Sequence, residues 1–307
     1  MESDQEAVFE ICVKNLVLGC FSGYNATVLA YGQTGSGKTF TMGSTYVQGV
    51  ADEEQGIIPR VVRTIFSEVE KRSPSYEFVI KCSFIEIYNE EIVNLLEAGN
   101  PGPKKEITIR EEKGAIVLMN LKEEVVSCAE DLESCLDRGA TSRCVASTAM
   151  NETSSRSHGI FTIAIEQYPR EEGNESAVNS GKKPDMTAKF HFVDLAGSER
   201  AKKTGAVGAT LKEGISINMG LLALGNVIAA LTEESKRSVH VRYRDSKLTR
   251  ILQDSLGGNS RTTMIACCSP AEYNFAETLN TLQYASRARN IKNKPVVNRD
   301  PDKLAIE

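Results

Sequence analysis

The sequence predicts an α/β fold in which a mixed central sheet carries helices on both of its faces. Strand-like apolar runs alternate along the chain with segments of helical periodicity, the pattern of strands joined by helices. The 307 residues, 41% of them hydrophobic, can enclose one large buried core. No internal repeat or linker-like stretch divides the chain. We therefore expect one main domain.

The first third of the chain supplies helices and strands in alternation. Apolar spacings near three and four predict a helix over 5–19, and the apolar run 26–30 predicts a short buried strand. A glycine-rich loop follows and opens a second helix, which polar residues 45–55 interrupt before it resumes over 58–72. β-Branched and aromatic residues predict a strand over 76–88.

The alternation continues to the C-terminal end. Turn-rich loops are expected at 97–105 and 169–186, and short strands within 106–126. Further strands are predicted over 159–168, 189–195 and 262–268, and further helices over 129–138, 211–231 and 278–291.

Composition excludes several classes of protein. A formal net charge of −5 argues against a chain that coats nucleic acid or anionic membrane with its whole surface. No apolar run is long enough for a membrane span, and no secretory signal opens the sequence. The eight cysteines lack metal-binding or disulfide spacing. We interpret them as reduced intracellular thiols.

The glycine-rich loop fits the pattern G-x-x-x-x-G-K-[ST] between a predicted strand and a predicted helix. Its N–H groups and the helix N-terminus suit phosphate oxygens, Lys38 suits the outer phosphates, and the Thr39 hydroxyl suits Mg²⁺. A chance match has odds on the order of one in a hundred in a chain of average composition. The predicted nucleotide-binding residues are Gly32, Gln33, Thr34, Gly35, Ser36, Gly37, Lys38 and Thr39.

Two further loops carry dense polar motifs. Residues 151–158 read NETSSRSH, and residues 194–199 read DLAGSE directly after a predicted strand. With AYGQTGSGKT at 30–39, they resemble the kinesin signature set NxxSSRSH, DLAGSE and AYGQTGSGKT in the family's order. Similarity continues through YRDSKLTR at 243–250 and covers nearly the whole chain. The resemblance implies the kinesin motor fold, a P-loop NTPase-type sheet, and an ATPase that moves or exerts force along microtubules.

The metal site follows from the chemistry of these loops. Asp194 at a strand end suits a carboxylate that holds Mg²⁺ through water, beside Thr39. Ser155 can complete the metal shell. Gly197 offers a backbone N–H that can approach the γ-phosphate closely.

The catalytic residues come from the same two loops. We expect Asn151 to touch phosphate or the attacking water, and Ser154 to help place that water. The resemblance implies that Arg156 and Glu199 pair when ATP closes the site, after which Glu199 accepts a proton through a relay. Any one of them alone has about even odds of being a solvated loop residue. Their joint order favours the functional interpretation.

Phe40 matches a family position whose ring stacks on adenine. A phenylalanine inside a helix is by itself more often a core residue, at about three to one. The resemblance favours the adenine contact.

Two basic segments stand out in the acidic chain. Residues 200–212 carry four cations and no acid, and residues 236–250 carry six cations and one acid. An isolated charge run is a solvated loop about two times in three. Both segments fall where kinesins contact acidic tubulin, which predicts salt-sensitive binding. The predicted microtubule contacts are Arg200, Lys203, Arg244, Lys247 and Arg250.

The last residues resemble a neck linker. IKNKPVVN at 291–298 matches the segment that docks along the motor when ATP binds, with Asn298 at the position of a latching asparagine. A frayed terminus is the competing interpretation. We therefore predict a motor domain over 1–291 and a neck-linker-like segment over 292–307.

The resemblance also implies a missing element. A complete motor has an N-terminal strand that lines the adenine pocket, whereas this chain begins just before the first helix. We expect an exposed sheet edge and weakened nucleotide binding. One alternative is a truncated, catalytically impaired microtubule-binding module. Another is a P-loop GTPase-like switch, for which the chain lacks an NKxD guanine signal, as kinesins do.

Residues 265–271 and 278–298 look closest to the chromokinesin branch, the fourth kinesin family. That branch implies cytoplasm and microtubule cytoskeleton, with nucleus and spindle as further locations. We expect a monomer for this chain and a coiled-coil dimer for a full-length protein. No membrane partner and no direct nucleic acid contact are expected.

Overall fold

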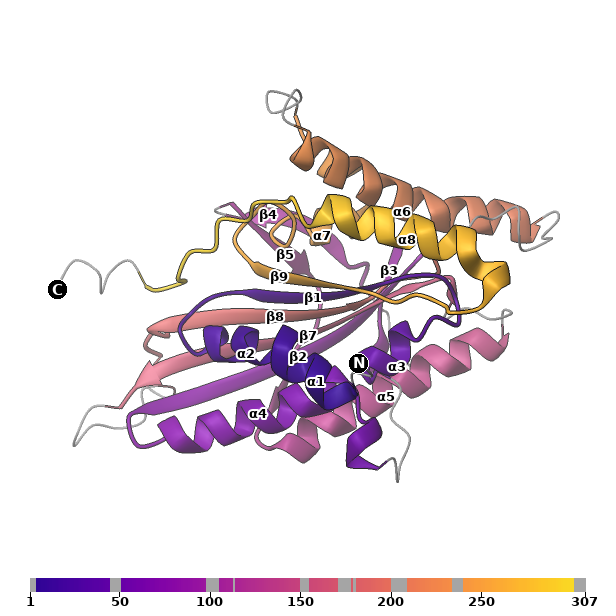
Figure 1. The fold of residues 1–307 in the computed structure, drawn as a ribbon. Coiled ribbons are helices and arrows are strands. Elements are labelled where there is room, and N and C mark those ends of the chain that lie inside the picture. Colours follow the sequence, from indigo (N-terminus) through magenta and orange to yellow (C-terminus); the bar gives the residue numbers. More distant parts are fainter. Residues whose placement is uncertain are drawn as a thin grey trace.

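A twisted sheet runs through the middle of the molecule, with helices above and below it (Figure 1). The computed structural model describes residues 4–44, 51–97, 105–112, 114–149, 155–170, 178, 181–199, 209–233 and 240–300, with backbone alone at 146–149 and 209–218. The layers confirm the α/β fold with a mixed sheet.

The sheet follows the order β3 (Glu91–Asn94), β2 (Tyr76–Tyr88), β7 (His158–Pro169), β8 (Met186–Asp194), β1 (Ala26–Tyr31) and β9 (Arg261–Ala266), and β6 (Glu124–Val126) pairs with β2. The strands β8, β1 and β9 run parallel, whereas β7 is antiparallel to both β2 and β8. The strand β9 forms one edge within the described part. Outside this sheet, β4 (Thr108–Glu112) pairs with β5 (Ala115–Met119) in a separate hairpin.

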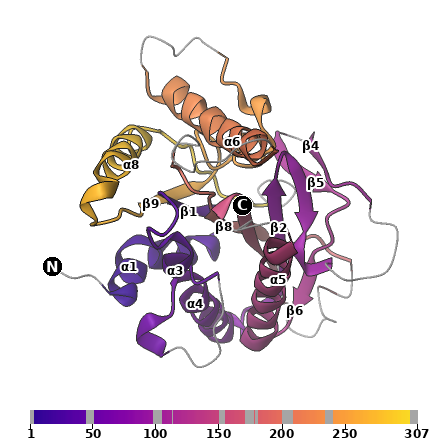
Figure 2. The ribbon, with the colours of Figure 1, turned by 90° about the vertical axis from the view of Figure 1, so that its right-hand side faces the viewer.

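Each face of the sheet has its own hydrophobic core. In β1, Val28 and Ala30 face one core, whereas Leu29 and Tyr31 face the other. This is why β1 is apolar throughout: both its faces are covered. The lower layer holds α1 (Gln5–Cys12), α2 (Lys14–Cys20), α3 (Lys38–Met42), α4 (Ile57–Arg72) and α5 (Ala129–Ala149), and the upper layer holds α6 (Ala209–Thr232), α7 (Lys247–Ile251) and α8 (Phe275–Ala288) (Figure 2).

Several elements differ from the sequence prediction in their bounds. The helix predicted over 5–19 is two helices, because the chain leaves helical geometry at Val13 (φ −126°). The helix α5 continues well past residue 138, and its buried Arg143 explains why the apolar pattern fades there. The helix α8 ends at Ala288, and Ile291 packs against the upper core from the segment that follows.

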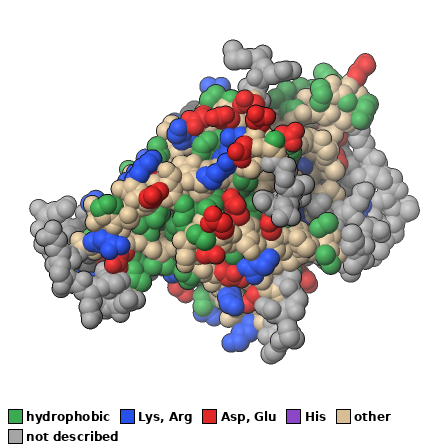
Figure 3. All heavy atoms as spheres, turned by 90° about the horizontal axis from the view of Figure 1, so that it is seen from below, with side chains coloured by type: hydrophobic (Ala, Val, Ile, Leu, Met, Phe, Trp, Pro, Cys, Tyr) green, Lys and Arg blue, Asp and Glu red, His purple; other side chains and the backbone are tan. Residues whose placement is uncertain are grey.

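The lower surface carries a mixture of charges. Seen from below, acidic and basic side chains are interspersed over this face (Figure 3). Among the described helices, none is both long and apolar enough to cross a bilayer. All eight cysteines are free thiols. This face therefore offers no field of a single sign to an oppositely charged partner.

Candidate functional site

The glycine-rich loop connects β1 to α3. Gly35 (φ 76°) and Gly37 (φ 94°) adopt left-handed conformations that favour glycine. A Cβ at either position would meet nothing within 4 Å, so the loop surrounds open space. The carbonyl oxygen of Gln33 accepts hydrogen bonds from Ser36 Oγ at 2.8 Å and from Lys38 Nζ at 2.9 Å. The lysine side chain is thus held against the loop, and the space beside the two glycines is free.

Lys38 is buried at the start of α3, with 7% of its surface exposed. Burial lowers the pKa of its ammonium group, and the carboxylates of Asp194 and Glu199 oppose that effect. A cation held in a poorly solvated position interacts strongly with anionic oxygens. The setting suits a phosphate group.

The carboxylate of Asp194 meets the glycine-rich loop at the end of β8. Its Oδ2 accepts a hydrogen bond from Thr39 Oγ1 at 2.9 Å. Its Oδ1 is buried and has no partner among the described residues. An orphaned carboxylate oxygen beside a threonine hydroxyl fits the hard oxygen ligands of Mg²⁺, with Asp194 acting through water.

The loop after β8 is tied to both other motifs. The Gly197 N–H donates to the carbonyl oxygen of Ser155 at 2.8 Å, and the Ser198 N–H donates to that of Gly32 at 3.1 Å. A Cβ on Gly197 would overlap the Glu199 carboxylate and the Thr34 hydroxyl. Only glycine leaves room for this approach.

The Glu199 carboxylate lies against the glycine-rich loop. Its Oε2 accepts from the Thr34 N–H at 2.8 Å, and its Oε1 accepts from Thr34 Oγ1 at 2.6 Å. The Thr34 N–H of the loop thus donates to an anionic oxygen in this structure, as it could to a phosphate oxygen. Arg156 lies in the turn before β7, and its pairing with Glu199 in the ATP-bound state stays a prediction.

Three other predicted residues remain untested. Asn151 and Ser154 lie outside the described residues. The Phe40 side chain is 61% exposed, and its contact with adenine stays a prediction.

The sequence analysis missed Arg143, a buried arginine of α5 that joins these loops. Its Nη1 lies 3.1 Å from Asp194 Oδ2, and its Nε lies 3.5 Å from Glu86 Oε1. Its Nη2 donates to the Ser157 carbonyl oxygen at 2.9 Å, and Ser157 Oγ donates to Glu86 Oε1 at 2.5 Å. Arg143 and Glu86 lie outside the sequence motifs described above. Their burial was the missing signal.

His158 closes the same network behind the phosphate site. Its Nδ1 accepts a hydrogen bond from the Ala196 N–H at 3.0 Å. Burial, with the nearby cations Arg143 and Lys38, lowers the pKa of the imidazole to about 3. His158 is therefore a neutral acceptor that holds the loop after β8 in place.

Three of the cations predicted to contact microtubules lie at or next to α7. Arg244, Lys247 and Arg250 line a shallow hollow together with residues of β4. The Arg244 side chain is 76% exposed and that of Arg250 is 17% exposed, and they lie 4.0 and 3.8 Å from Glu111 Oε2. Arg200 and Lys203 lie outside the described residues. Glu111 of the β4–β5 hairpin, which was not predicted from the sequence, partly neutralises the positive charge of this hollow.

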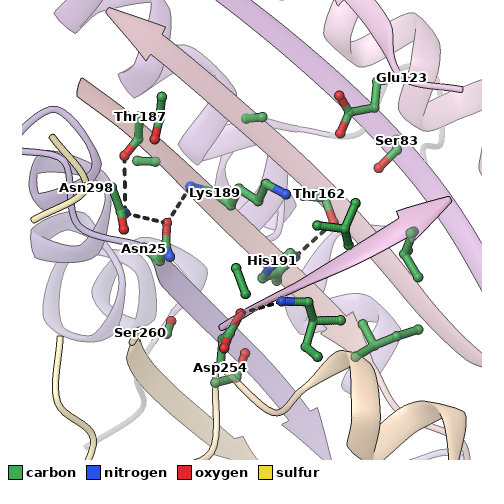
Figure 4. Close-up of a pocket in the computed structure, with 18 of the residues that line it drawn as sticks. Asn25, Ser83, Glu123, Thr162, Thr187, Lys189, His191, Asp254, Ser260 and Asn298 are labelled. Atoms are coloured by element: carbon green, nitrogen blue, oxygen red, sulfur yellow. Dashed lines mark hydrogen bonds between the residues drawn. The ribbon is translucent and has the colours of Figure 1, made fainter. Parts of the chain in front are cut away.

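The segment after α8 lies along the sheet and ends in hydrogen bonds of Asn298. Its Nδ2 lies 2.9 Å from the Gly23 carbonyl oxygen, 3.0 Å from Asn25 Oδ1 and 3.3 Å from the Thr187 carbonyl oxygen. Its Oδ1 accepts from Asn259 Nδ2 at 2.9 Å. Figure 4 shows Asn298 beside Asn25 and Thr187, in the wall of a cavity of about 500 Å³. The end of this segment is thus anchored.

The family model described as "Kinesin motor domain" matches residues 1–291. Chromosome-associated kinesin KIF4 of Gallus gallus is 57% identical over 300 residues, which are 97% of this chain and 24% of that protein. Chromosome-associated kinesin KIF4A of Homo sapiens is 56% identical over 301 residues, 97% of this chain and 23% of that protein. The chain thus spans about a quarter of the length of these relatives.

A solved structure gives the same result. The structure described as "Structure of a fast kinesin: Implications for ATPase mechanism and interactions with microtubules" superposes with a TM-score of 0.84 at 44% identity. The match covers 97% of this chain and 80% of that chain. The chain belongs to the kinesin motor domain family.

Proposed function

We propose that this chain hydrolyses ATP with Mg²⁺, that microtubules stimulate the hydrolysis, and that it drives movement or force along them. The observation that carries the proposal is the contact of Asp194 and Glu199 with the glycine-rich loop at Thr39 and Thr34. Two motifs far apart in sequence, the glycine-rich loop and the loop after β8, thus lie against each other, and Ser155 of the third motif accepts a hydrogen bond from the Gly197 N–H. This arrangement supports a common phosphate site. Family membership supports the same activity.

The phosphate end of the site has a clear division of work. When bound, Mg²⁺ neutralises charge on the β- and γ-phosphates. Thr39 and Asp194 would hold it, and Ser155 is proposed to complete the shell. Lys38 would bind the outer phosphates, and the Gly197 N–H would leave the Ser155 carbonyl to reach the γ-phosphate.

We assign the proton transfer in ATP hydrolysis to the loops at 151–158 and 194–199. Glu199 now accepts two hydrogen bonds from Thr34, so its carboxylate is within reach of the phosphate cradle. We propose that it exchanges this partner for Arg156 in the closed state and then receives a proton from water. Asn151 and Ser154 are proposed to place that water.

The microtubule, called the track below, is the proposed macromolecular partner. Cations around α7 give a basic surface that acidic tubulin can bind, and ions in solution would screen this attraction. We further propose association with the microtubule cytoskeleton, with the cytoplasm, nucleus and spindle as locations, and a coiled-coil dimer in a longer protein. The proposed contacts are Arg200, Lys203, Arg244, Lys247 and Arg250.

A magnesium titration tests the phosphate site. Thr39→Ala removes the hydroxyl beside Asp194, so we expect the Mg²⁺ concentration for half-maximal ATP hydrolysis to rise by about tenfold or more. Thr41→Ala is the matched control, because it removes a hydroxyl from the same helix whose only described contact is Cys267 Sγ at 3.9 Å. Equal magnesium dependence in the Thr39 variant and the unsubstituted chain would contradict the assignment.

A further inference from the structure

The tight turn between β2 and β3 holds two residues in an unusual backbone conformation. Asn89 (φ 50°) and Glu90 (φ 60°) are both left-handed, and neither is glycine. Tyr88 pairs with Glu91 across the turn, so the loop has two residues and favours glycine at its second position. A left-handed glutamate persists where its surroundings hold it.

The contacts that hold Glu90 come from the first turn of α7. Its Oε1 accepts from Ser246 Oγ at 2.8 Å, and its Oε2 accepts from the Lys247 N–H at 2.7 Å. Ser246 is the N-cap of α7 and also accepts from the Leu248 N–H at 3.1 Å. Hydrogen bonds to a carboxylate are short and strong. A distant hairpin turn therefore fixes the start of this helix.

The same carboxylate lies beside the long helix α6. A Cβ on Gly220 would lie 3.4 Å from His158 Nε2, 3.7 Å from Ser246 Oγ and 3.8 Å from Glu90 Oε1. His158 in turn accepts from the Ala196 N–H. His158, Ser246 and Glu90 thus all lie around one glycine of α6, between the loop after β8 and the start of α7.

We propose that Glu90 is a positioning residue for track binding. It holds α7 so that Arg244, Lys247 and Arg250 share one surface, and it links that surface to the loop after β8. The inference rests on the proposed function, in which these cations bind the track. Charge alone predicts the opposite sign, because removing an acid from a basic surface strengthens binding to an acidic partner. Positioning predicts weaker binding.

Hydrogen exchange tests the positioning without any track. In Glu90→Ala we expect the Lys247 amide to exchange about tenfold faster, because its charged acceptor is lost. The Leu248 amide should also exchange faster, because its acceptor, Ser246 Oγ, loses the hydrogen bond that holds it to Glu90. Glu91→Ala is the matched control: it removes the same charge one residue away, from an exposed side chain with no hydrogen bond or ion pair among the described residues. Protected amides of β2 and β7 report that the variants remain folded.

Microtubule pelleting then tests the consequence. We expect Glu90→Ala to weaken binding about tenfold and Glu91→Ala to leave it unchanged or stronger. Glu90→Gly removes the carboxylate and also relieves the left-handed strain, so it should bind as poorly as the alanine variant. Basal ATP hydrolysis should stay unchanged in both.

Two results would overturn the proposal. One is unchanged exchange at 247–248 in Glu90→Ala, and the other is microtubule binding at or above that of the unsubstituted chain. An unsubstituted chain that binds no microtubules would remove the proposed track function, while the exchange rates would still decide whether Glu90 holds α7.

Discussion

Arg143 is the residue on which the buried charges behind the phosphate site depend. It is 5% exposed and contacts two carboxylates, those of Asp194 and Glu86. Removing one partner of a buried ion pair leaves an uncompensated charge, which costs far more than losing a surface pair. The orientation of Asp194, and with it the proposed metal site, therefore depends on a side chain of α5.

We expect Arg143→Met to lower the free energy of unfolding by about 3 to 5 kcal/mol, measured by chemical denaturation. Arg138→Met is the control on the same helix, since the Arg138–Glu124 pair is partly exposed (49% and 27% of the two side chains) and should cost at most about 1 kcal/mol. Similar losses in the two variants would show that the buried network contributes no more than a surface pair.

His158 makes a pH dependence that can be measured. Its pKa falls from 6.5 in the unfolded chain to about 3 in the folded protein, mainly through burial. The neutral imidazole therefore stabilises the fold above about pH 6.5, and this stability is lost as pH falls toward 3. Between pH 7.5 and pH 5 we expect the free energy of unfolding to drop by about 2 kcal/mol from this group.

The variant His158→Asn should flatten that dependence, because it keeps an acceptor for the Ala196 N–H and removes the titrating ring. His240→Asn, at an exposed position, is the control. A slope that survives in His158→Asn would assign the effect to other groups.

The site residues that sequence could predict are those inside contiguous motifs. Thr39, Asp194 and Glu199 lie in such motifs, and in the structure Asp194 contacts Thr39 while Glu199 contacts Thr34 of the same glycine-rich loop. Their roles toward a nucleotide stay predictions. Arg143 and Glu90 were not predicted, because a single charged residue in a polar stretch looks the same whether it is buried or solvated. Their roles come from tertiary contacts that no local pattern records.

The segment after α8 is held in place largely by hydrogen bonds. Asn298 alone contacts four groups on the loop before β1, on β8 and on the loop before β9. Further contacts are the Lys294 N–H to the Gly258 carbonyl oxygen and the Val296 N–H to Asn259 Oδ1. Few apolar contacts support it, so its local stability should be low.

We expect Asn298→Ala to speed amide exchange over residues 294–300 by about tenfold or more, since several hydrogen bonds are lost together. Val296→Ala is the control, because that side chain is 61% exposed and its backbone bond is kept. Unchanged exchange in Asn298→Ala would show that the backbone bonds suffice.

At the scale of elements, strong periodicity or apolar runs predicted most of the sheet. The strand β3 was missed because its turn, Asn89 and Glu90, lacks the glycine that usually signals a hairpin. The later half of α5 was missed because a buried ion pair replaces its apolar stripe. In both cases a tertiary contact of a charged side chain replaces the local signal.

At the scale of the whole molecule, a few residues around α6 lie between the proposed phosphate site and the proposed microtubule-binding surface. The proposed phosphate site lies at the ends of β1 and β8, and the basic hollow lies at α7. His158, Gly220 and Glu90 lie between them. A change of the loop after β8 with the nucleotide would therefore reach α7 through closely spaced residues.

Steady-state ATP hydrolysis by the purified chain, with and without polymerised microtubules and at low and about 0.15 M ionic strength, tests the central claim most directly. We predict hydrolysis that microtubules stimulate strongly at low salt and less at high salt. Hydrolysis at the same rate with and without microtubules would contradict the proposed coupling of hydrolysis to microtubule binding. Salt-sensitive pelleting of the chain with microtubules, without hydrolysis, would instead identify a catalytically impaired microtubule-binding module.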